Sequence, residues 1–293
     1  MRIEEAWELQ RRWSMLAKRT AGAIARWRAA NLMLILLGSV LGALAAQLSG
    51  AWGALAGPLG AASALALAFA AFIQSRLLTQ ERIRLRIRSR AAAESLRGIV
   101  FQYLAKVPPF DGENRGELLG DRVGQVGRLT DQPGEAALLL AAAVDGRPLP
   151  NVAGIADYVR ERAVDQRAWH ARRAGETLAL AKRWRGAQLA ATAVATALAA
   201  LGGVVSAVNL STWVAVATTA AAALAAHLAA SQYDRIADSY ARTALALDAL
   251  LAEFDPDTED VHRAGRFVAA TERVLAAENE AWVAVFSARA GGP

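Results

Sequence analysis

The sequence of 293 residues contains no cysteine, which excludes disulfide bonds, thiolate metal sites and cysteine nucleophiles. Histidine is also scarce, and none of the three has a metal-ligand spacing to another His, Asp or Glu on a predicted helix face: His170, His227 and His262. No nucleophile elbow and no Walker loop occur. We therefore expect a protein that is not an enzyme, with no catalytic residue, no metal site and no cofactor.

Charge is missing from two long segments, which lie between Arg28 and Arg76 and between Arg185 and Asp234. A helix needs about 20 apolar residues to cross a bilayer, so each segment has room for two crossings and a short turn. A helix on the surface of a soluble protein would instead carry charges along its wet face. The sequence predicts an all-α membrane protein with four transmembrane helices in two hairpins of the same orientation, at about 29–47, 53–74, 186–205 and 214–231.

Charged helices flank these hairpins and divide the chain into three parts. We expect a first helix–hairpin–helix unit over 1–107, a cytoplasmic linker over 108–154, and a second unit over 155–293. The second crossing is expected to continue as a charged helix to about 106, and the fourth as a polar helix to about Glu253. The linker holds five of the eight prolines, and a short helix is plausible around 134–144.

The two predicted units resemble each other in sequence. Arg26-Trp27-Arg28 enters the first hairpin and Arg183-Trp184-Arg185 enters the second. Trp52 and Trp213 occupy equivalent places in the two turns. This similarity predicts an internal duplication. The four tryptophans suit the water–lipid interface, because an indole has an apolar body and a polar N–H: Trp27, Trp52, Trp184 and Trp213.

The charges also predict the orientation in the membrane. Both hairpin turns are uncharged, whereas the segments before and after the hairpins are rich in arginine. By the positive-inside rule, we expect both termini, the linker and the charged helices to lie in the cytoplasm of a multi-pass protein of the plasma membrane. We attribute the net charge of +6 to contact with anionic lipid rather than with nucleic acid.

Some polar residues interrupt the hydrophobic segments. These segments contain no Asp, Glu, Lys or Arg, and their one histidine is His227. Ionisable groups in a membrane are functional candidates, although a neutral imidazole near the interface would also fit. The others could line a pore or bond to neighbouring helices. The candidates are Asn31, Gln47, Gln74, Thr218 and His227.

Two further sets of charged residues lie outside the hairpins. Glu278 falls in the apolar stripe of the last helix, where a carboxylate needs a partner, and we expect a structural ion pair with an arginine. Four arginines below the second crossing share a helix face that could bind lipid or nucleotide phosphates at a cytoplasmic mouth, or could simply be solvated: Arg82, Arg86, Arg90 and Arg97.

Several stretches resemble the SLATT family, the two-transmembrane effector domains associated with SMODS and SLOG systems of bacteria. They include Arg90-Ala91-Ala92-Ala93-Glu94-Ser95-Leu96, Asp165-Gln166-Arg167-Ala168-Trp169 and Glu278-Asn279-Glu280-Ala281-Trp282. The resemblance covers two tandem copies. It implies a pore-forming effector of the bacterial inner membrane that permeabilises the membrane in antiviral or interbacterial conflict.

Three functions remain as hypotheses. The first is a homo-oligomeric pore or channel, since four helices of one chain cannot easily enclose a water path. The alternative is a non-conducting membrane scaffold or sensor whose cytoplasmic helices bind a partner. A coupled transporter ranks third, because the hairpins contain no Asp, Glu, Lys or Arg to carry protons. Expected partners are membrane lipids and further copies of the chain, with a nucleotide second messenger or a cytoplasmic protein as candidate triggers.

Overall fold

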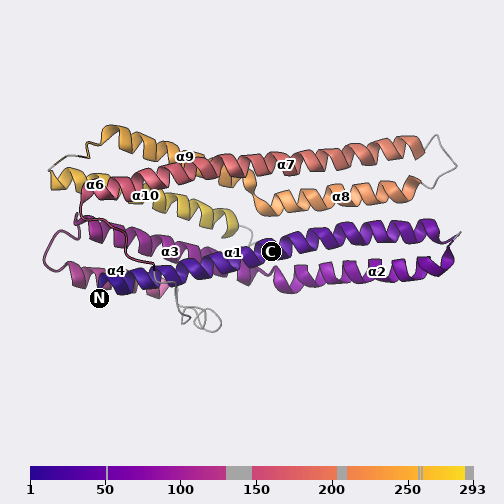
Figure 1. Ribbon diagram of the computed structural model, residues 1–293, viewed down its shortest axis with the longest axis horizontal. Helices are drawn as coiled ribbons and strands as arrows, with labels where there is room; N and C mark the ends of the chain where they lie inside the picture. The colour runs from indigo at the N-terminus through magenta and orange to yellow at the C-terminus, as the bar shows by residue number, and fades with distance from the viewer. Residues whose placement is uncertain (51, 130–146, 203–209, 257, 259, 288–293) are drawn as a thin grey trace. The chain divides into compact units, whose positions relative to one another are not determined.

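The structure is a computed structural model in which all regular elements of the described residues are helices (Figure 1). It describes residues 1–293 except 51, 130–146, 203–209, 257, 259 and 288–293, with the backbone alone over 281–287. The elements are α1 (Ile3–Leu48), α2 (Gly53–Phe72), the π-helix η1 (Ile73–Leu77), α3 (Gln80–Ala105), α4 (Arg115–Leu129), α6 (Ile155–Tyr158), the π-helix η2 (Val159–Val164), α7 (Asp165–Gly202), α8 (Leu210–Ser231), α9 (Tyr233–Glu253) and α10 (Val261–Ser287).

The chain forms two compact units, and neither is continuous in sequence. Unit 1 consists of Met1–Ala21, Gln80–Glu176 and Arg235–Pro293. Unit 2 consists of Gly22–Thr79 and Thr177–Asp234. The long helices α1 and α7 each begin in unit 1 and end in unit 2. Both halves of the sequence therefore contribute to each unit.

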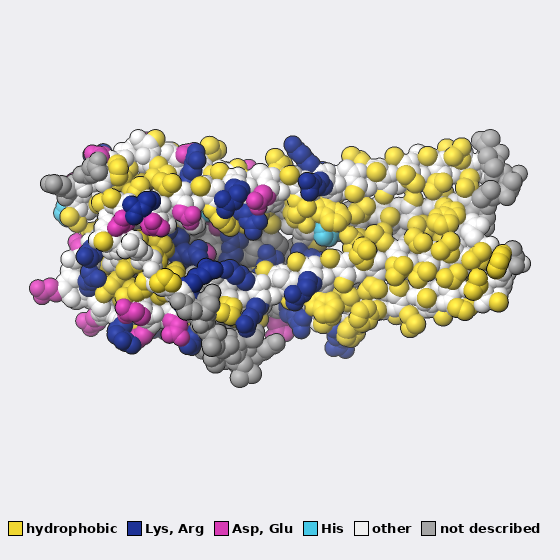
Figure 2. All heavy atoms as spheres, viewed as in Figure 1, with side chains coloured by type: hydrophobic (Ala, Val, Ile, Leu, Met, Phe, Trp, Pro, Cys, Tyr) yellow, Lys and Arg dark blue, Asp and Glu magenta, His cyan; other side chains and the backbone are white. Residues whose placement is uncertain are grey.

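Unit 2 holds the apolar segments. Three helical stretches are long and apolar enough to cross a membrane: Ile3–Leu48, Gly53–Leu77 and Leu210–Glu253. The predicted crossing at 186–205 runs partly over 203–209, which lie outside the described residues. Large hydrophobic side chains are exposed on this unit, as Figure 2 shows over α2 and α8; Met33, Leu65 and Leu189 are 66%, 72% and 69% exposed. Such a surface is typical of contact with lipid or with another protein.

Within unit 2, α1 packs antiparallel to α2. The hydroxyl of Ser63 on α2 donates a hydrogen bond of 2.7 Å to the carbonyl oxygen of Gly38 on α1. A Cβ added to Gly38 would lie 2.8 Å from Cγ of Leu67, so glycine allows the two helices to approach closely. Further along α1, Gly42 faces Ser63. By contrast, Gly57 has open space around its Cα and makes no such contact.

Two predicted continuous helices are interrupted. The helix that follows α2 passes through η1 and then ends at Leu78, whose φ of −105° and ψ of 41° are not helical. The helix of the fourth crossing ends at Ser231, because Gln232 has a φ of 54°. Neither break has a Gly or Pro to signal it, so both sequence predictions of an unbroken helix are wrong at these points.

Unit 1 is a bundle of amphipathic helices with two clusters of buried side chains. The first cluster joins the start of α1 to α3 and α4, and Trp13, Leu96 and Leu119 are among its buried residues. The second joins α3, α6, η2 and α10, with Tyr158 and Phe267 in ring contact. Helix α4 therefore occupies part of the predicted linker, because Leu119 and Val123, one turn apart, supply an apolar stripe. The short helix expected at 134–144 lies outside the described residues.

Candidate functional site

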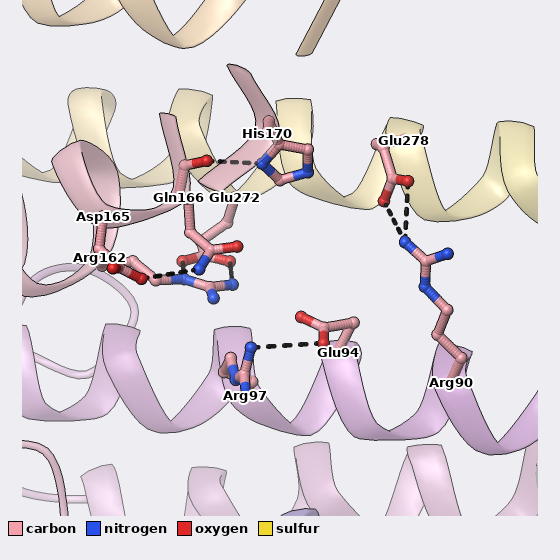
Figure 3. A network of polar contacts seen from close by, with 9 residues as sticks. All are labelled: Arg90, Glu94, Arg97, Arg162, Asp165, Gln166, His170, Glu272 and Glu278. Atoms are coloured by element: carbon pink, nitrogen blue, oxygen red, sulfur yellow. Dashed lines mark hydrogen bonds and ion pairs between the residues drawn. The ribbon is translucent and has the colours of Figure 1, made fainter. Parts of the chain in front are cut away.

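A network of charged side chains crosses the interior of unit 1 (Figure 3). It joins α3, η2, α7 and α10, and its members come from distant parts of the sequence. Burying charges costs free energy unless they are paired and hydrogen-bonded. The network is therefore the first place in the described residues to look for a function beyond packing.

The first pair joins α3 to α10. Nη2 of Arg90 donates to both carboxylate oxygens of Glu278, at 2.9 and 3.1 Å. The side chain of Glu278 is only 5% exposed and that of Arg90 20%. Burial raises the pKa of the Glu278 carboxyl although Arg90 opposes that shift. The arginine that the sequence leads us to expect beside Glu278 is therefore one of the four assigned to the cytoplasmic mouth.

The second pair joins η2 to α10 and lies deeper. Nε and Nη2 of Arg162 each donate a hydrogen bond of 3.0 Å to Glu272, one to each carboxylate oxygen. The hydroxyl of Tyr158 donates a third bond, of 2.8 Å, to the same carboxylate. Burial raises the pKa of Tyr158 well above its usual value, and the charge of Glu272 adds to this effect. Burial opposes the charge of Arg162, but Glu272 outweighs it and raises the pKa of the guanidinium.

Local backbone structure brings this pair together. Arg162 lies in the π-helix η2, where the wider turn departs from the ordinary helical spacing. On the opposite side, Gly98 of α3 leaves room for the carboxylate, since a Cβ there would lie 2.7 Å from Oε2 of Glu272. The face of the Phe101 ring lies 5.1 Å from the guanidinium carbon of Arg162. This pair could not be predicted from the sequence, because no local pattern connects two residues 110 positions apart.

His170 lies beside this network on α7. Its Nδ1 is 2.7 Å from the carbonyl oxygen of Gln166, one turn earlier, and its ring packs edge-on against Trp169 and Tyr240. The side chain is buried, and burial lowers the pKa of the imidazole. We therefore assign a neutral ring whose Nδ1–H donates to Gln166.

The four predicted mouth arginines do not remain one open patch. Arg90 is paired with Glu278, as above, and Arg97 lies 3.4 Å from Glu94 on its own helix. Arg82 is exposed and Arg86 is half-buried, and both have interaction partners of their own. Arg90 therefore forms the structural ion pair expected of Glu278, and binding of an anion by Arg82, Arg86 and Arg97 stays a prediction.

The polar residues of the hydrophobic segments mostly bond to their own helix. The hydroxyl of Thr218 donates to the carbonyl oxygen of Val214 at 2.8 Å, as Thr192 does to Gln188 at 3.0 Å. Asn31 is half-buried and Gln74 is exposed, while Gln47 is half-buried and has a partner. These contacts give no indication of a continuous polar path within the described part of unit 2.

His227 has aromatic neighbours within unit 2. Its Nε2 is 3.2 Å from the hydroxyl of Tyr233, and the centre of its ring lies 4.6 Å from that of Trp184. Of the four tryptophans assigned to the interface, Trp52 is 63% exposed, and Trp27, Trp184 and Trp213 are half-buried. His227 and Trp184 therefore form a cluster close to where α8 ends.

A cavity of about 710 Å³ adjoins the charged network in unit 1. It lies between α3 and α10, with Pro108, Pro109 and Arg122 also in its wall. Its polar wall contains Glu94, Arg162, Glu272, Arg273 and Asn279. Small-molecule sites in proteins have volumes of about 300–1,000 Å³ and few polar groups in a mainly apolar wall. The cavity is thus of a size and composition suited to a small ligand.

Comparison with known families assigns the two halves of the sequence separately. Residues 158–282 match the family model SLATT_1, described as SMODS and SLOG-associating 2TM effector domain 1. Residues 11–117 match the model of DUF4231, described as a protein of unknown function. No curated protein and no solved structure matches the chain. The SLATT similarity is therefore found once, over residues 158–282, and two tandem SLATT copies remain a prediction. Together with the apolar helices, this match indicates a membrane protein.

Proposed function

We propose that this chain, which carries a SLATT domain at residues 158–282, is a bacterial membrane effector whose copies assemble into a pore. One observation carries the proposal. Unit 2 exposes large apolar side chains such as Leu65, Phe69 and Leu189, and the sequence of its hydrophobic segments contains no Asp, Glu, Lys or Arg. Only lipid, or another copy of the same apolar surface, can cover such a unit without a large cost in free energy.

The proposal includes a topology of four crossings in two hairpins, in the bacterial inner membrane, with both termini in the cytoplasm. It is supported by the uncharged turns and the arginines that flank the apolar segments. The close contact of α1 with α2 supports the first hairpin. For the second, the rings of Trp184 and His227 lie in contact, and at the other end Cβ of Leu210 lies 3.6 Å from the position of a Cβ on Gly202. These contacts support an antiparallel course for both pairs of helices.

Assembly of several chains is part of the proposal, because the contacts among the described helices of one chain give no indication of a water path between them. α1 and α2 touch through Gly38 and Ser63, and the threonine hydroxyls of α7 and α8 bond to their own backbones. A pore would then be narrow, apolar and weakly selective, since fixed charges are missing from its walls. Arg82 and Arg86 would add positive potential at its cytoplasmic mouth and favour anions.

The test is solute flux through purified protein in liposomes. Protein at increasing surface density should release a small anionic dye, and release should rise more steeply than linearly with density if several chains form each pore. The mass in mild detergent, after subtraction of detergent, should be several times 30.9 kDa. The variant Arg82→Gln with Arg86→Gln should shift the reversal potential toward cations. A well-folded protein that is monomeric and releases no dye would contradict the pore.

The second candidate is a non-conducting membrane sensor or scaffold, and we assign no enzymatic activity under either proposal. It is favoured by one specific observation, the cavity beside the charged network in unit 1. A sensor would bind a cytoplasmic ligand or partner there and pass no ions. The two candidates differ in the flux experiment, since a sensor bound to its ligand would leave the dye inside the liposomes.

A further inference from the structure

We propose that the cavity of unit 1 is a binding site for a small organic phosphate, with Arg162 and Asn279 as the residues that receive it. The inference does not depend on conduction, because it concerns binding by the helices of unit 1 alone. Its starting point is that two residues in the wall of this cavity each hold a buried polar atom that lacks a hydrogen-bond partner in the described structure: Nη1 of Arg162 and Oδ1 of Asn279.

Arg162 is buried and has one nitrogen without a partner in the described structure. Its side chain is 2% exposed, and Glu272 occupies two of its three nitrogens. Figure 3 shows the third nitrogen pointing away from Glu272 toward α3. A buried charged donor without an acceptor costs free energy, so such an atom in a native protein calls for an occupant. The occupant must offer an acceptor oxygen.

Asn279 is the second residue of the cavity wall with such an atom. It lies on α10, is 7% exposed, and its side-chain amide can either donate or accept a hydrogen bond. Together with Arg162 it offers two fixed points of attachment within one cavity. A single water molecule could satisfy either atom, whereas a cavity of about 710 Å³ has room for a larger ligand.

The charges around the cavity favour an anion. The carboxylate of Glu272 is saturated by Arg162 and Tyr158, and that of Glu94 is paired with Arg97. At the edge of the cavity, Arg122 and Arg273 are exposed and make no ion pair within the described part of the chain. Glu280, which is exposed on α10, adds one negative charge at the same edge. Guanidinium groups match the oxygen geometry of phosphate, and several of them suit an anion with more than one charge.

The remaining wall favours an organic body on that phosphate. Ile99, Pro108, Pro109 and Leu275 supply apolar surface on both sides of the cavity. Gln102 adds one further amide. Inorganic phosphate would fill little of this volume, whereas a molecule of the size of a nucleotide or a sugar phosphate would contact the polar and apolar parts together.

The experiment measures binding to the full chain in detergent by thermal shift and calorimetry. The probes are AMP, glucose 6-phosphate, short-chain phosphatidic acid, inorganic phosphate, adenosine and citrate. At least one organic phosphate should bind at least about tenfold more tightly than inorganic phosphate or its unphosphorylated body, since either lacks part of the contacts. Binding by phosphatidic acid alone would identify a lipid headgroup as the source. Equal binding by inorganic phosphate, binding by citrate alone, or no binding would overturn the proposal.

Variants outside the buried pair keep the test independent of folding. Arg122→Gln and Arg273→Gln should each weaken binding about tenfold, as expected for the loss of a charge-assisted hydrogen bond. Their matched controls are Arg128→Gln on α4 and Arg266→Gln on α10, which are exposed and lie outside the cavity wall. Ser95→Trp should abolish binding by filling the cavity from an exposed position. If Arg122→Gln, Arg273→Gln and Ser95→Trp bind the ligand with the same affinity as the control variants, the site does not lie in this cavity.

Discussion

At the scale of single residues, the pair of Arg162 and Glu272 has the largest consequences for unit 1. Both side chains are nearly inaccessible to water, and Tyr158 completes the hydrogen bonds of the carboxylate. In such surroundings, removal of one partner leaves a buried charge unpaired and strongly destabilises the fold. Replacement of both partners with apolar residues destabilises it less, because no buried charge remains.

Replacing Arg162 with Met should therefore lower the free energy of unfolding by about 3 kcal/mol, since Glu272 stays buried without its partner. The double variant Arg162→Met with Glu272→Leu should recover much of this loss, because no buried charge remains. Denaturant titration in detergent would measure both. Arg160→Gln, in the same π-helix but exposed, is the control and should change stability little. Equal losses in the single and double variants would show that shape rather than charge is responsible.

His170 predicts a pH dependence of unit 1. Burial lowers its pKa in the folded protein below the unfolded value of about 6.5. The positive charges of Arg90 and Arg162 lower this pKa further, whereas the negative charge of Glu94 raises it. As pH falls through about 6.5, the unfolded chain takes up a proton that the folded chain resists, so stability decreases. Glu278 acts in the opposite direction at lower pH, because its raised pKa lets the folded state hold a proton first.

The measurement is the melting temperature of unit 1 between pH 7.5 and pH 5.5, in the native protein and in His170→Gln. The native protein should lose up to about 1.4 kcal/mol of stability for each pH unit below 6.5, and the variant should lose this component of the slope. Because Glu278 is present in both proteins, its contribution cancels in the comparison. Identical slopes would rule out His170 as the source.

At the scale of elements, two glycines of the first apolar hairpin have different surroundings. Gly38 lies at the contact of α1 with α2, whereas Gly57 on α2 has open space beside it. A leucine at Gly38 would collide with Leu67, because its Cβ would lie 2.8 Å from Cγ of Leu67. A Cβ added at Gly57 has no neighbouring atom within 4 Å in the described structure.

We expect Gly38→Leu to separate α1 from α2 and to destabilise unit 2 by about 1–3 kcal/mol, the usual cost of overpacking. Gly57→Leu, the matched control, should change stability less, since the higher helix propensity of leucine offsets the constraint that Pro58 places on the residue before it. Resistance to thermal unfolding in one detergent would compare the two variants. A similar effect of both would mean that hydrophobicity, and not helix contact, determines the result.

At the scale of the whole molecule, the proposed topology can be tested by thiol labelling, because the chain has no cysteine of its own. A cysteine introduced at Ser49 or Ser211, beside the two uncharged turns, should react with an impermeant thiol reagent added outside intact cells. A cysteine at Ser95, on α3 of unit 1, should react only after the membrane is opened. Labelling of the Ser95 variant in intact cells would reverse the orientation.

The sequence by itself determined the helical class and the position of the apolar segments. These features are local, because the charge-free stretches, the tryptophans at the turns and the helical periodicity are all read within about 20 residues. The need of Glu278 for a partner could also be predicted, since its place in an apolar stripe is visible in the sequence. Its actual partner, Arg90, is 188 positions away and required the structure.

Only the tertiary structure decided where the helices break and which charges meet. The end of the helix at Leu78 and the positive φ of Gln232 have no signal in residue type, so packing around them must select these conformations. The pairing of Arg162 with Glu272, the space left by Gly98 and the cavity beside them arise from three segments that are far apart in the sequence. Their meeting depends on how the helices of unit 1 pack, which local patterns of hydrophobicity and charge do not specify.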